Sequence, residues 1–342
     1  MPVCSTSKCH CPRGVDQGDW NDWRWQVANS LYGADDMLLL SARGCSTDSS
    51  MSAVIERYPF RVSPYYLSLA DAEDPENSVT KQFLPDVREL EDATACMADP
   101  FDECASTQVP GVVQRYSDRV LVMVNGECVV RCRHCTRKNT LTGELSDIRD
   151  RWPETLAFLK SSSSVREVIF SGGDPLLCDS GVLDRILGEV SAIPHVEVLR
   201  IGTRVPVVLP MRLDEDMCNM LAAHRPLWLN TQFNHPSELT DAAMEACNRL
   251  IARGIPVSNQ CVLLKGINDD AETLVALCNK LQANMIRPYY VFLCDPVAGV
   301  SHLRTSRETA QRLASELRNM LSGLAMPLFV ADVPGAGCKV PL

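Results

Sequence analysis

Residues 119–135 read RVLVMVNGECVVRCRHC, an apolar run followed at once by three closely spaced cysteines. The apolar run predicts a β-strand, and Cys128, Cys132 and Cys135 fall in the loop directly after it. Three thiolates at this spacing can wrap around one corner of a cube and hold three irons of a [4Fe–4S] cluster. The fourth iron then stays open to a small chelating molecule. Zinc is the alternative, but a closed zinc site needs a fourth protein ligand, and His134 lies too near the cysteines to be an obvious one.

The pattern continues to the end of the chain. From about residue 112, short apolar runs alternate with segments that carry apolar residues at helical spacing. Such alternation predicts a parallel sheet, and six or more units predict a complete or partial barrel, with its chemistry in the loops after the strands. The expected strands are 119–124, 167–170, 196–201, 227–230, 257–264, 289–293 and 328–331, and the expected helices are 154–160, 181–192, 215–223, 240–252, 271–282 and 307–321.

A second polar motif follows the second expected strand. Residues 171–174 read SGGD. Paired glycines allow the backbone to approach a ligand closely, and they can turn amide donors toward a carboxylate. A plain turn explains a lone Gly-Gly-Asp about as well. Its place after a strand favours a ligand-binding loop beside the cysteines.

Composition narrows the possible partners and the compartment. The 342 residues carry a net charge of −10, which argues against nucleic acid or an anionic membrane as partner and permits a cationic substrate. No apolar run approaches the roughly 20 residues of a membrane-spanning helix. The N-terminal cysteines Cys4, Cys9 and Cys11 have no apolar stretch behind them, which argues against a secretory signal. We therefore expect a cytoplasmic protein whose 16 cysteines are mostly reduced.

We expect four regions along the chain. Residues 1–18 form a flexible tail with cysteines, and residues 19–111 form an N-terminal helical region. The barrel covers 112–325, and 326–342 hold a final strand and a lysine-bearing segment.

The three-cysteine loop resembles the motif of the radical S-adenosylmethionine superfamily. From about residue 20 onward, further stretches resemble the lysine 2,3-aminomutase family in the expected order. They are NDWRWQ at 21–26, SPYYLSL at 63–69, RYSDR at 115–119, CRHCTR at 132–137, FNHP at 233–236, NQ at 259–260, RPYY at 287–290, CD at 294–295 and DVPG at 332–335.

This resemblance implies a fold and a reaction. The fold is α/β, a partial (β/α)6-type barrel behind an N-terminal helical region. The reaction is an isomerisation that moves the α-amino group of a cationic amino acid to its β carbon, with a [4Fe–4S] cluster, S-adenosylmethionine and pyridoxal 5′-phosphate as cofactors. L-Lysine is the expected substrate. Arginine, and a lysine destined for attachment to a translation factor, remain open as alternatives. A flavodoxin or ferredoxin would supply electrons, and a homo-oligomer is expected.

The resemblance also implies roles for individual residues. Lys339 corresponds to the catalytic lysine that forms the Schiff base with pyridoxal phosphate, and Gln232 stands where a histidine is usual. The S-adenosylmethionine site comprises Ser171, Gly172, Gly173, Asp174, Thr203 and Gln232. The pyridoxal phosphate site comprises Lys339, Arg115, Tyr116, Arg119 and Gln260. Arg137 would bind the substrate carboxylate through its planar fork, and Asp295 and Asp332 would bind the distal ammonium.

Besides Gln232, the sequence departs from the family at two further places. It stops three residues after Lys339, where relatives usually continue into a segment with a zinc-binding cysteine cluster, and the internal partner of that zinc would fall near Asp270. We therefore expect the zinc segment to be absent. Phe292 and Leu293 make the neighbourhood of Asp295 more apolar than usual, which leaves lysine and arginine unresolved. A non-catalytic cluster- or zinc-binding protein is the remaining alternative, and the retained Lys339 argues against it.

Overall fold

The computed structural model describes residues 14–33, 35–36, 49–71, 74, 76–91, 96–140, 145 and 147–342. The cysteines of the expected tail, Cys4, Cys9 and Cys11, lie outside the described residues. No helix in this described part is long and apolar enough to cross a membrane.

A ten-stranded sheet forms the centre of the molecule, and its seven middle strands, β5 to β11, run parallel. The strands β4 and β3 add to one edge and β12 to the other, all antiparallel to their neighbours. Among the described strands the sheet stays open, with β3 and β12 at its two edges. The bounds are β3 Thr107–Val109, β4 Val112–Val113, β5 Arg119–Asn125, β6 Glu167–Gly172, β7 Val198–Gly202, β8 Leu227–Thr231, β9 Val257–Leu263, β10 Arg287–Leu293, β11 Leu328–Asp332 and β12 Lys339–Pro341.

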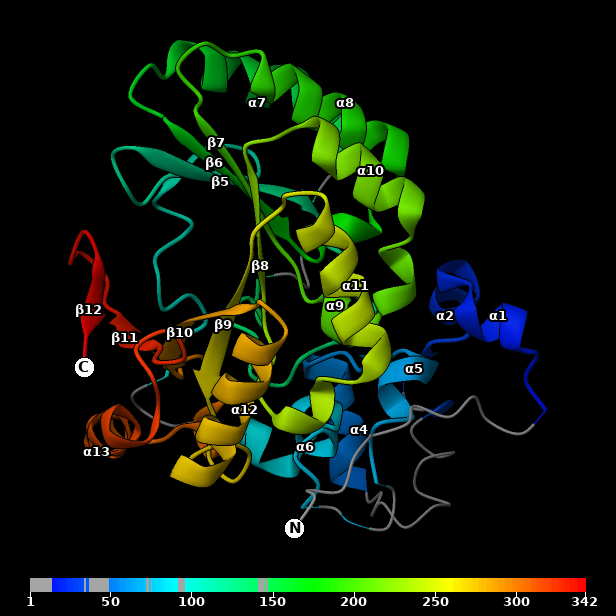
Figure 1. Cartoon of the computed structure of the whole chain (residues 1–342), viewed down its shortest axis with the longest axis vertical. Coiled ribbons are helices and arrows are strands. Elements are labelled where there is room, and N and C mark those ends of the chain that lie inside the picture. The colour runs from blue at the N-terminus through cyan, green and yellow to red at the C-terminus, as the bar shows by residue number, and fades with distance from the viewer. Residues whose placement is uncertain are drawn as a thin grey trace.

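Helices follow six of the parallel strands and cover the convex side of the curved sheet (Figure 1). The predicted α/β partial barrel with six strand–helix units is thereby confirmed. Their bounds are α7 Ile148–Ser161, α8 Ser180–Ser191, α9 Val205–Val208, α10 Glu215–Ala223, α11 Asp241–Ala252, α12 Ala271–Ala283 and α13 Arg307–Met320, with short 3-10 turns at Pro175–Leu177, Pro210–Arg212, Pro236–Glu238 and Ser301–Leu303.

Local sequence explains where these elements begin and which face they bury. Helices α10, α11 and α12 start after Asp214, Thr240 and Asp270, whose side chains accept a hydrogen bond from a backbone N–H in the first turn. Residues of β5 alternate between buried and half-buried, since successive side chains of a strand point to opposite faces. The buried set packs into the core, and the half-buried set is left for the concave side of the sheet.

The N-terminal region packs onto the barrel and shares its hydrophobic core. It contains short helices and one antiparallel strand pair, β1 with β2. The expected boundary between residues 111 and 112 falls inside the β3–β4 hairpin, so this hairpin belongs to the main sheet. The elements are α1 Gln17–Asn21, α2 Trp23–Ala28, β1 Leu31–Tyr32, α4 Ser49–Arg57, β2 Arg61–Val62, α5 Pro64–Leu67, α6 Thr80–Phe83 and the 3-10 turn Val87–Leu90.

Candidate active site

Most of the expected site residues lie at the carboxyl ends of the parallel strands, and therefore at one end of the barrel. Cys128 lies three residues after β5, and Gly172 is the last residue of β6. Thr203 and Gln232 follow β7 and β8 directly, and Asp332 ends β11. Strand ends of a parallel barrel face the same side, so these residues border one region.

Two expected residues sit differently with respect to the strands. Asp295 lies two residues beyond β10, at the same end of the barrel as the others. Gln260 lies in the middle of β9, where it pairs in register with Tyr290 of β10. It is half-buried between two buried neighbours, so its side chain takes the same face as the half-buried Val262. Gln260 is therefore a residue of the barrel wall, and it lies farther from the loops than the residues at the strand ends.

The three cysteines of the loop after β5 line one pocket, together with Arg137. Its empty volume is about 420 Å³. Burial raises the pKa of the Cys128 and Cys135 thiols, so a positively charged metal group is needed to hold them as thiolates here. Within the described residues, no group of three or more His, Cys, Asp or Glu side chains is arranged around a single metal ion, as zinc requires. Three cysteines around a shared pocket fit a cluster, which binds each thiolate on a different iron.

Gly172 and Gly173 hold the cysteine loop close to the end of β6. A Cβ atom on Gly173 would lie 2.2 Å from the carbonyl oxygen of Glu127, and one on Gly172 would lie 2.5 Å from that of Asn125. Gly172 also has a φ of +119°, which L side chains rarely adopt. The two glycines are therefore required for backbone packing against the residues that lead into Cys128. The sequence alone offered a ligand as the reason for this pair.

Asp174 and Thr203 form a buried pair between the loops after β6 and β7. The Thr203 hydroxyl donates to Asp174 Oδ1 at 2.6 Å, and the backbone N–H of Arg204 donates to Oδ2 at 2.8 Å. Burial raises the pKa of Asp174. Ser171 lies one step back in β6, paired in register with Met123 of β5.

Gln232 reaches the cysteine loop. Its Nε2 lies 2.8 Å from Nε2 of His134. Within the described part of the chain, two buried polar atoms nearby have no hydrogen-bond partner, Nδ1 of His134 and Oγ1 of Thr231. Buried polar groups are normally satisfied, so these atoms fit a region completed by a polar ligand such as S-adenosylmethionine.

Lys339 opens β12 and pairs in antiparallel register with Asp332 of β11. Its Nζ contacts Oδ2 of Asp332, and Arg115 donates two hydrogen bonds to the same carboxylate, at 2.8 and 3.2 Å. A second pocket of about 730 Å³ lies beside these residues. It is lined by Phe101, Asp102, Ser106, Gln114, Arg115, Tyr116, Val333, Pro334, Gly335, Gly337 and Cys338.

Aromatic rings and cations surround Lys339. Its Nζ lies 5.9 Å from the centre of the Tyr116 ring and 5.4 Å from that of Phe292. The Arg119 guanidinium lies 3.9 Å from the Tyr116 ring centre. Gly335 has a φ of +76°, so this glycine serves the turn before Lys339. Arg115 and Tyr116 line the second pocket, and Lys339 and Arg119 lie against the Tyr116 ring. An amine, two guanidinium groups and a flat ring gathered in this way fit an anionic aromatic aldehyde such as pyridoxal phosphate.

Asp295 and Asp332 are close enough to influence each other, yet their environments differ. Burial, followed by the charge of Asp332, raises the pKa of Asp295 to about 7. Burial would also raise the pKa of Asp332, but hydrogen bonds from Arg115 and the charge of Lys339 lower it below its usual range. In the described part of the chain, the Asp295 carboxylate has no hydrogen-bond or ion-pair partner.

Arg137 lines the cysteine pocket, and its Nε and Nη2 bind both carboxylate oxygens of Glu103, at 2.8 and 2.6 Å. Burial would lower the pKa of Arg115, but the hydrogen bonds and charge of Asp332 raise it, and Glu103 adds a smaller effect in the same direction, so Glu103 lies within electrostatic reach of both pockets. Glu103 could not be found from the sequence, because a single acidic residue in an irregular segment is usually solvated.

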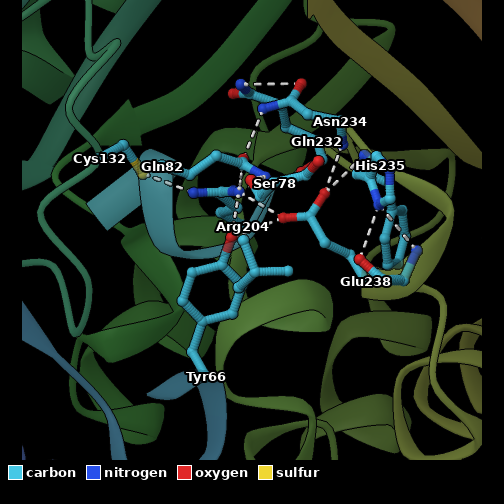
Figure 2. A network of polar contacts seen from close by, with 12 residues as sticks. Tyr66, Ser78, Gln82, Cys132, Arg204, Gln232, Asn234, His235 and Glu238 are labelled. Carbon is cyan, nitrogen blue, oxygen red and sulfur yellow. Dashed lines mark hydrogen bonds and ion pairs between the residues drawn. The ribbon is translucent and has the colours of Figure 1, made fainter. Parts of the chain in front are cut away.

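A buried network around Arg204 also escaped the sequence analysis (Figure 2). Its guanidinium contacts Cys132, Tyr66 and Glu238. One signal could have revealed it. Arg204 is a lone charge that directly precedes the apolar run 205–209, and a charge in such a run must be buried with a partner.

Comparisons with known proteins agree with this arrangement. Residues 122–278 match the model of the Radical SAM superfamily. L-lysine 2,3-aminomutase of Clostridium subterminale is 39% identical over 96% of this chain and 80% of its own length. The enzyme of that name from Fusobacterium nucleatum is 39% identical over the whole of this chain and 80% of its own. Glutamate 2,3-aminomutase of Clostridioides difficile is 34% identical over 95% of this chain and 77% of its own.

These matches identify an isomerase, since the relatives named are amino acid 2,3-aminomutases. Radical SAM enzymes use a [4Fe–4S] cluster and S-adenosylmethionine, and lysine aminomutases use pyridoxal phosphate in addition. The cysteine pocket, and the second pocket beside Lys339 (called the Lys339 pocket below), contain residues that fit these groups. The chain belongs to the lysine 2,3-aminomutase family of radical S-adenosylmethionine enzymes.

Proposed function

We propose that this enzyme moves the α-amino group of L-lysine to the β carbon and so produces β-lysine. The observation that carries the choice of substrate is the pair of carboxylates at the ends of neighbouring strands. Asp332 already has Arg115 and Lys339 as partners, whereas Asp295 has none among the described residues. An unpaired, largely buried carboxylate is costly, and a cationic group of the substrate would relieve that cost.

Charge also separates the candidate amino acids. The distal ammonium of lysine would lower the pKa of Asp295 and keep it ionised. The side-chain carboxylate of glutamate would instead add a third negative charge beside Asp295 and Asp332. This argues against glutamate, although one relative acts on it.

The cysteine pocket is proposed to hold the radical-generating groups. Cys128, Cys132 and Cys135 would bind three irons, and S-adenosylmethionine would complete the fourth. When bound and reduced, these groups supply the radical that removes hydrogen from C3 of the substrate. The expected binding residues around S-adenosylmethionine are Ser171, Gly172, Gly173, Asp174, Thr203 and Gln232. Of these, Asp174 is fixed by Thr203 and Gln232 by His134.

The Lys339 pocket is proposed to hold pyridoxal phosphate. When bound, its aldehyde supplies the attachment point for the migrating amino group. Arg115, Arg119 and Tyr116 would hold the phosphate and ring, and Gln260 would contact the cofactor from the barrel wall. Asp332 holds the Lys339 amine in place through their ion pair.

Arg137 is proposed to bind the substrate carboxylate. Glu103 holds its Nε and Nη2, and within the described residues Nη1 has no hydrogen-bond partner. One side of the guanidinium therefore remains for a carboxylate, in an orientation that Glu103 fixes. Since Glu103 influences Arg115 too, it would tie the carboxylate site to the cofactor site.

Arginine is the second candidate substrate. Two carboxylates also suit a guanidinium, and Phe292 and Leu293 give Asp295 an apolar surrounding that favours the more weakly hydrated cation. A lysine destined for attachment to a translation factor, an oligomeric assembly and a flavodoxin or ferredoxin as electron donor remain proposals from the family resemblance.

A competition assay tests the substrate. The reconstituted enzyme, with pyridoxal phosphate, S-adenosylmethionine and dithionite, is offered equal L-lysine, L-arginine and L-glutamate without oxygen. Chiral derivatisation and mass spectrometry then quantify the β-isomers. The proposal predicts β-lysine as the main product and no β-glutamate. A main product of β-arginine or β-glutamate contradicts it.

A further inference from the structure

We propose that Arg204 is a positioning residue that sets the reduction potential of the iron–sulfur cluster through Cys132. Nη1 of Arg204 lies 2.8 Å from Sγ of Cys132 (Figure 2). Within the described part of the chain, no other cationic side chain donates a hydrogen bond to one of the three cysteines. The inference rests on the proposed role of Cys132 as a cluster ligand.

The Arg204 guanidinium is held in place by residues from distant parts of the chain. Its Nη2 lies 2.9 Å from the Tyr66 hydroxyl, 2.5 Å from Oε1 of Gln82 and 2.7 Å from Oε1 of Glu238. Tyr66 and Gln82 belong to the N-terminal region and Glu238 to the loop after β8. A guanidinium with this many fixed acceptors cannot leave the sulfur without losing several buried hydrogen bonds.

Glu238 supplies the counter-charge, and it is fully buried. Oε1 of Glu238 accepts from Tyr66 at 2.6 Å and from Arg204, and Oε2 accepts from the backbone N–H groups of Asn234 at 2.6 Å and His235 at 2.9 Å. Four donors around two oxygens suit an ionised carboxylate, which accepts only. The positive charge of Arg204 is therefore shared between the Glu238 carboxylate and the Cys132 sulfur.

This arrangement acts on the electron that the cluster takes up. Reduction adds one negative charge to the cluster and breaks no bond, and a nearby cation favours the reduced form. Net charge and hydrogen bonds to the sulfurs are among the factors that set the potential of such clusters. Burial strengthens the effect because the field is weakly screened. Arg204 therefore raises the potential of the cluster, and Glu238 moderates this rise.

The backbone of Arg204 also contacts the loop after β6. Its N–H donates to Oδ2 of Asp174, which lies in the loop proposed to bind S-adenosylmethionine. A single residue thus fixes the position of that loop relative to Cys132.

Two variants that remove charges of opposite sign near the cluster test the inference. The reconstituted proteins Arg204→Gln and Glu238→Gln are compared with wild type in redox titrations followed by electron paramagnetic resonance, and iron is quantified in each. Loss of the cation should shift the midpoint potential downward, and loss of the carboxylate should shift it upward. Arg204→Lys keeps the charge but cannot reach all the acceptors, so its downward shift should be smaller. It also carries the test if Arg204→Gln does not fold.

Arg212 offers a matched control. It is also buried, but it donates to the backbone carbonyls of Leu176 and Cys178 and to Ser180. Arg212→Gln should leave the potential unchanged. Shifts of the same sign in Arg204→Gln and Glu238→Gln, or no shift in either, overturn the inference. A separate Cys132→Ala protein that retains full iron overturns the proposed cluster ligand instead, so the two failures are distinguishable.

Discussion

Arg115 donates two hydrogen bonds to Asp332 across the open side of the sheet, at 2.8 and 3.2 Å. Arg115 follows β4 near one edge of the sheet, and Asp332 ends β11 near the other. Both side chains are largely buried, with 17% and 7% of their surface exposed. The ion pair therefore links two edges that no described strand pairing joins, and it does so beside Lys339.

Arg115→Met should destabilise the cofactor-free protein by about 2–3 kcal/mol, because breaking a buried pair leaves an uncompensated charge that Lys339 only partly balances. Urea unfolding measures the loss. Arg149→Met removes an exposed pair with Asp147 and should cost less than about 1 kcal/mol. Equal losses in the two variants contradict a role for Arg115 in holding the sheet edges together.

Asp295 should make stability depend on pH. Its pKa is about 7 in the folded protein and 3.8 ordinarily, so the folded state binds the proton more tightly than the unfolded state. The contribution of Asp295 to the free energy of unfolding is fully present below pH 3.8 and is lost as the pH rises to about 7. The loss amounts to at most about 4 kcal/mol. Asp295→Asn should therefore gain in melting temperature relative to wild type between pH 5 and pH 8.

Asp332→Asn is the control for that measurement. The pKa of Asp332 is lowered, so its carboxylate stabilises the fold at every pH above its ordinary value of 3.8. Its asparagine variant should be less stable than wild type from pH 5 to pH 8. Because the charge of Asp332 also raises the pKa of Asp295, stability should fall less steeply with pH in this variant than in wild type. A difference between Asp295→Asn and wild type that stays flat over this range shows that the Asp295 carboxylate is ordinary.

Gly173→Ala should weaken both stability and cluster binding. Its Cβ would lie 2.2 Å from backbone of Glu127, so the cysteine loop must move, at a cost of about 2 kcal/mol or more. Thermal unfolding and iron content after reconstitution measure the two effects. Gly323→Ala meets no atom within 4 Å and should change neither. Full iron content in Gly173→Ala is incompatible with the packing role of this glycine.

Most of the iron should be lost from the reconstituted protein when one of the three loop cysteines is replaced by serine, as in Cys128→Ser, Cys132→Ser or Cys135→Ser. A cluster that is held by three thiolates tolerates the loss of one poorly. Cys247→Ser changes a buried cysteine of α11 outside the pocket and should retain full iron. The assignment of the pocket is wrong if any of the three loop variants binds iron as well as Cys247→Ser does.

Much of the barrel could be predicted because its pattern is local. Helix α10 has the expected bounds 215–223, and no end of an expected strand differs by more than two residues from the observed one. The clearest difference is α7, which begins at Ile148 and not at residue 154. The helix begins after Asp147, whose side chain caps it, and Pro153 is accommodated inside.

The site could be predicted only in part, for a physical reason. Residues such as Cys128 and Lys339 carry chemistry that a motif reveals. The partners of Arg204 come from elements far apart in the sequence, and Glu103 lies in an irregular segment. Contacts of this kind depend on how the N-terminal region packs onto the barrel, which no local pattern encodes. The mid-strand place of Gln260 follows from the expected strand 257–264, but its pairing with Tyr290 of β10 could not be predicted, because strand register is not visible in one sequence.

An isotope label on the migrating nitrogen tests most directly whether the α-amino group of lysine moves to the β carbon. L-Lysine labelled with nitrogen-15 at the α-amino group is incubated anaerobically with the reconstituted enzyme, pyridoxal phosphate, S-adenosylmethionine and dithionite, together with unlabelled ammonia. Mass spectrometric fragmentation locates the label. We expect β-lysine with the label on C3 and without exchange into ammonia. If S-adenosylmethionine is cleaved while every label remains on C2, the enzyme is not a 2,3-aminomutase of lysine.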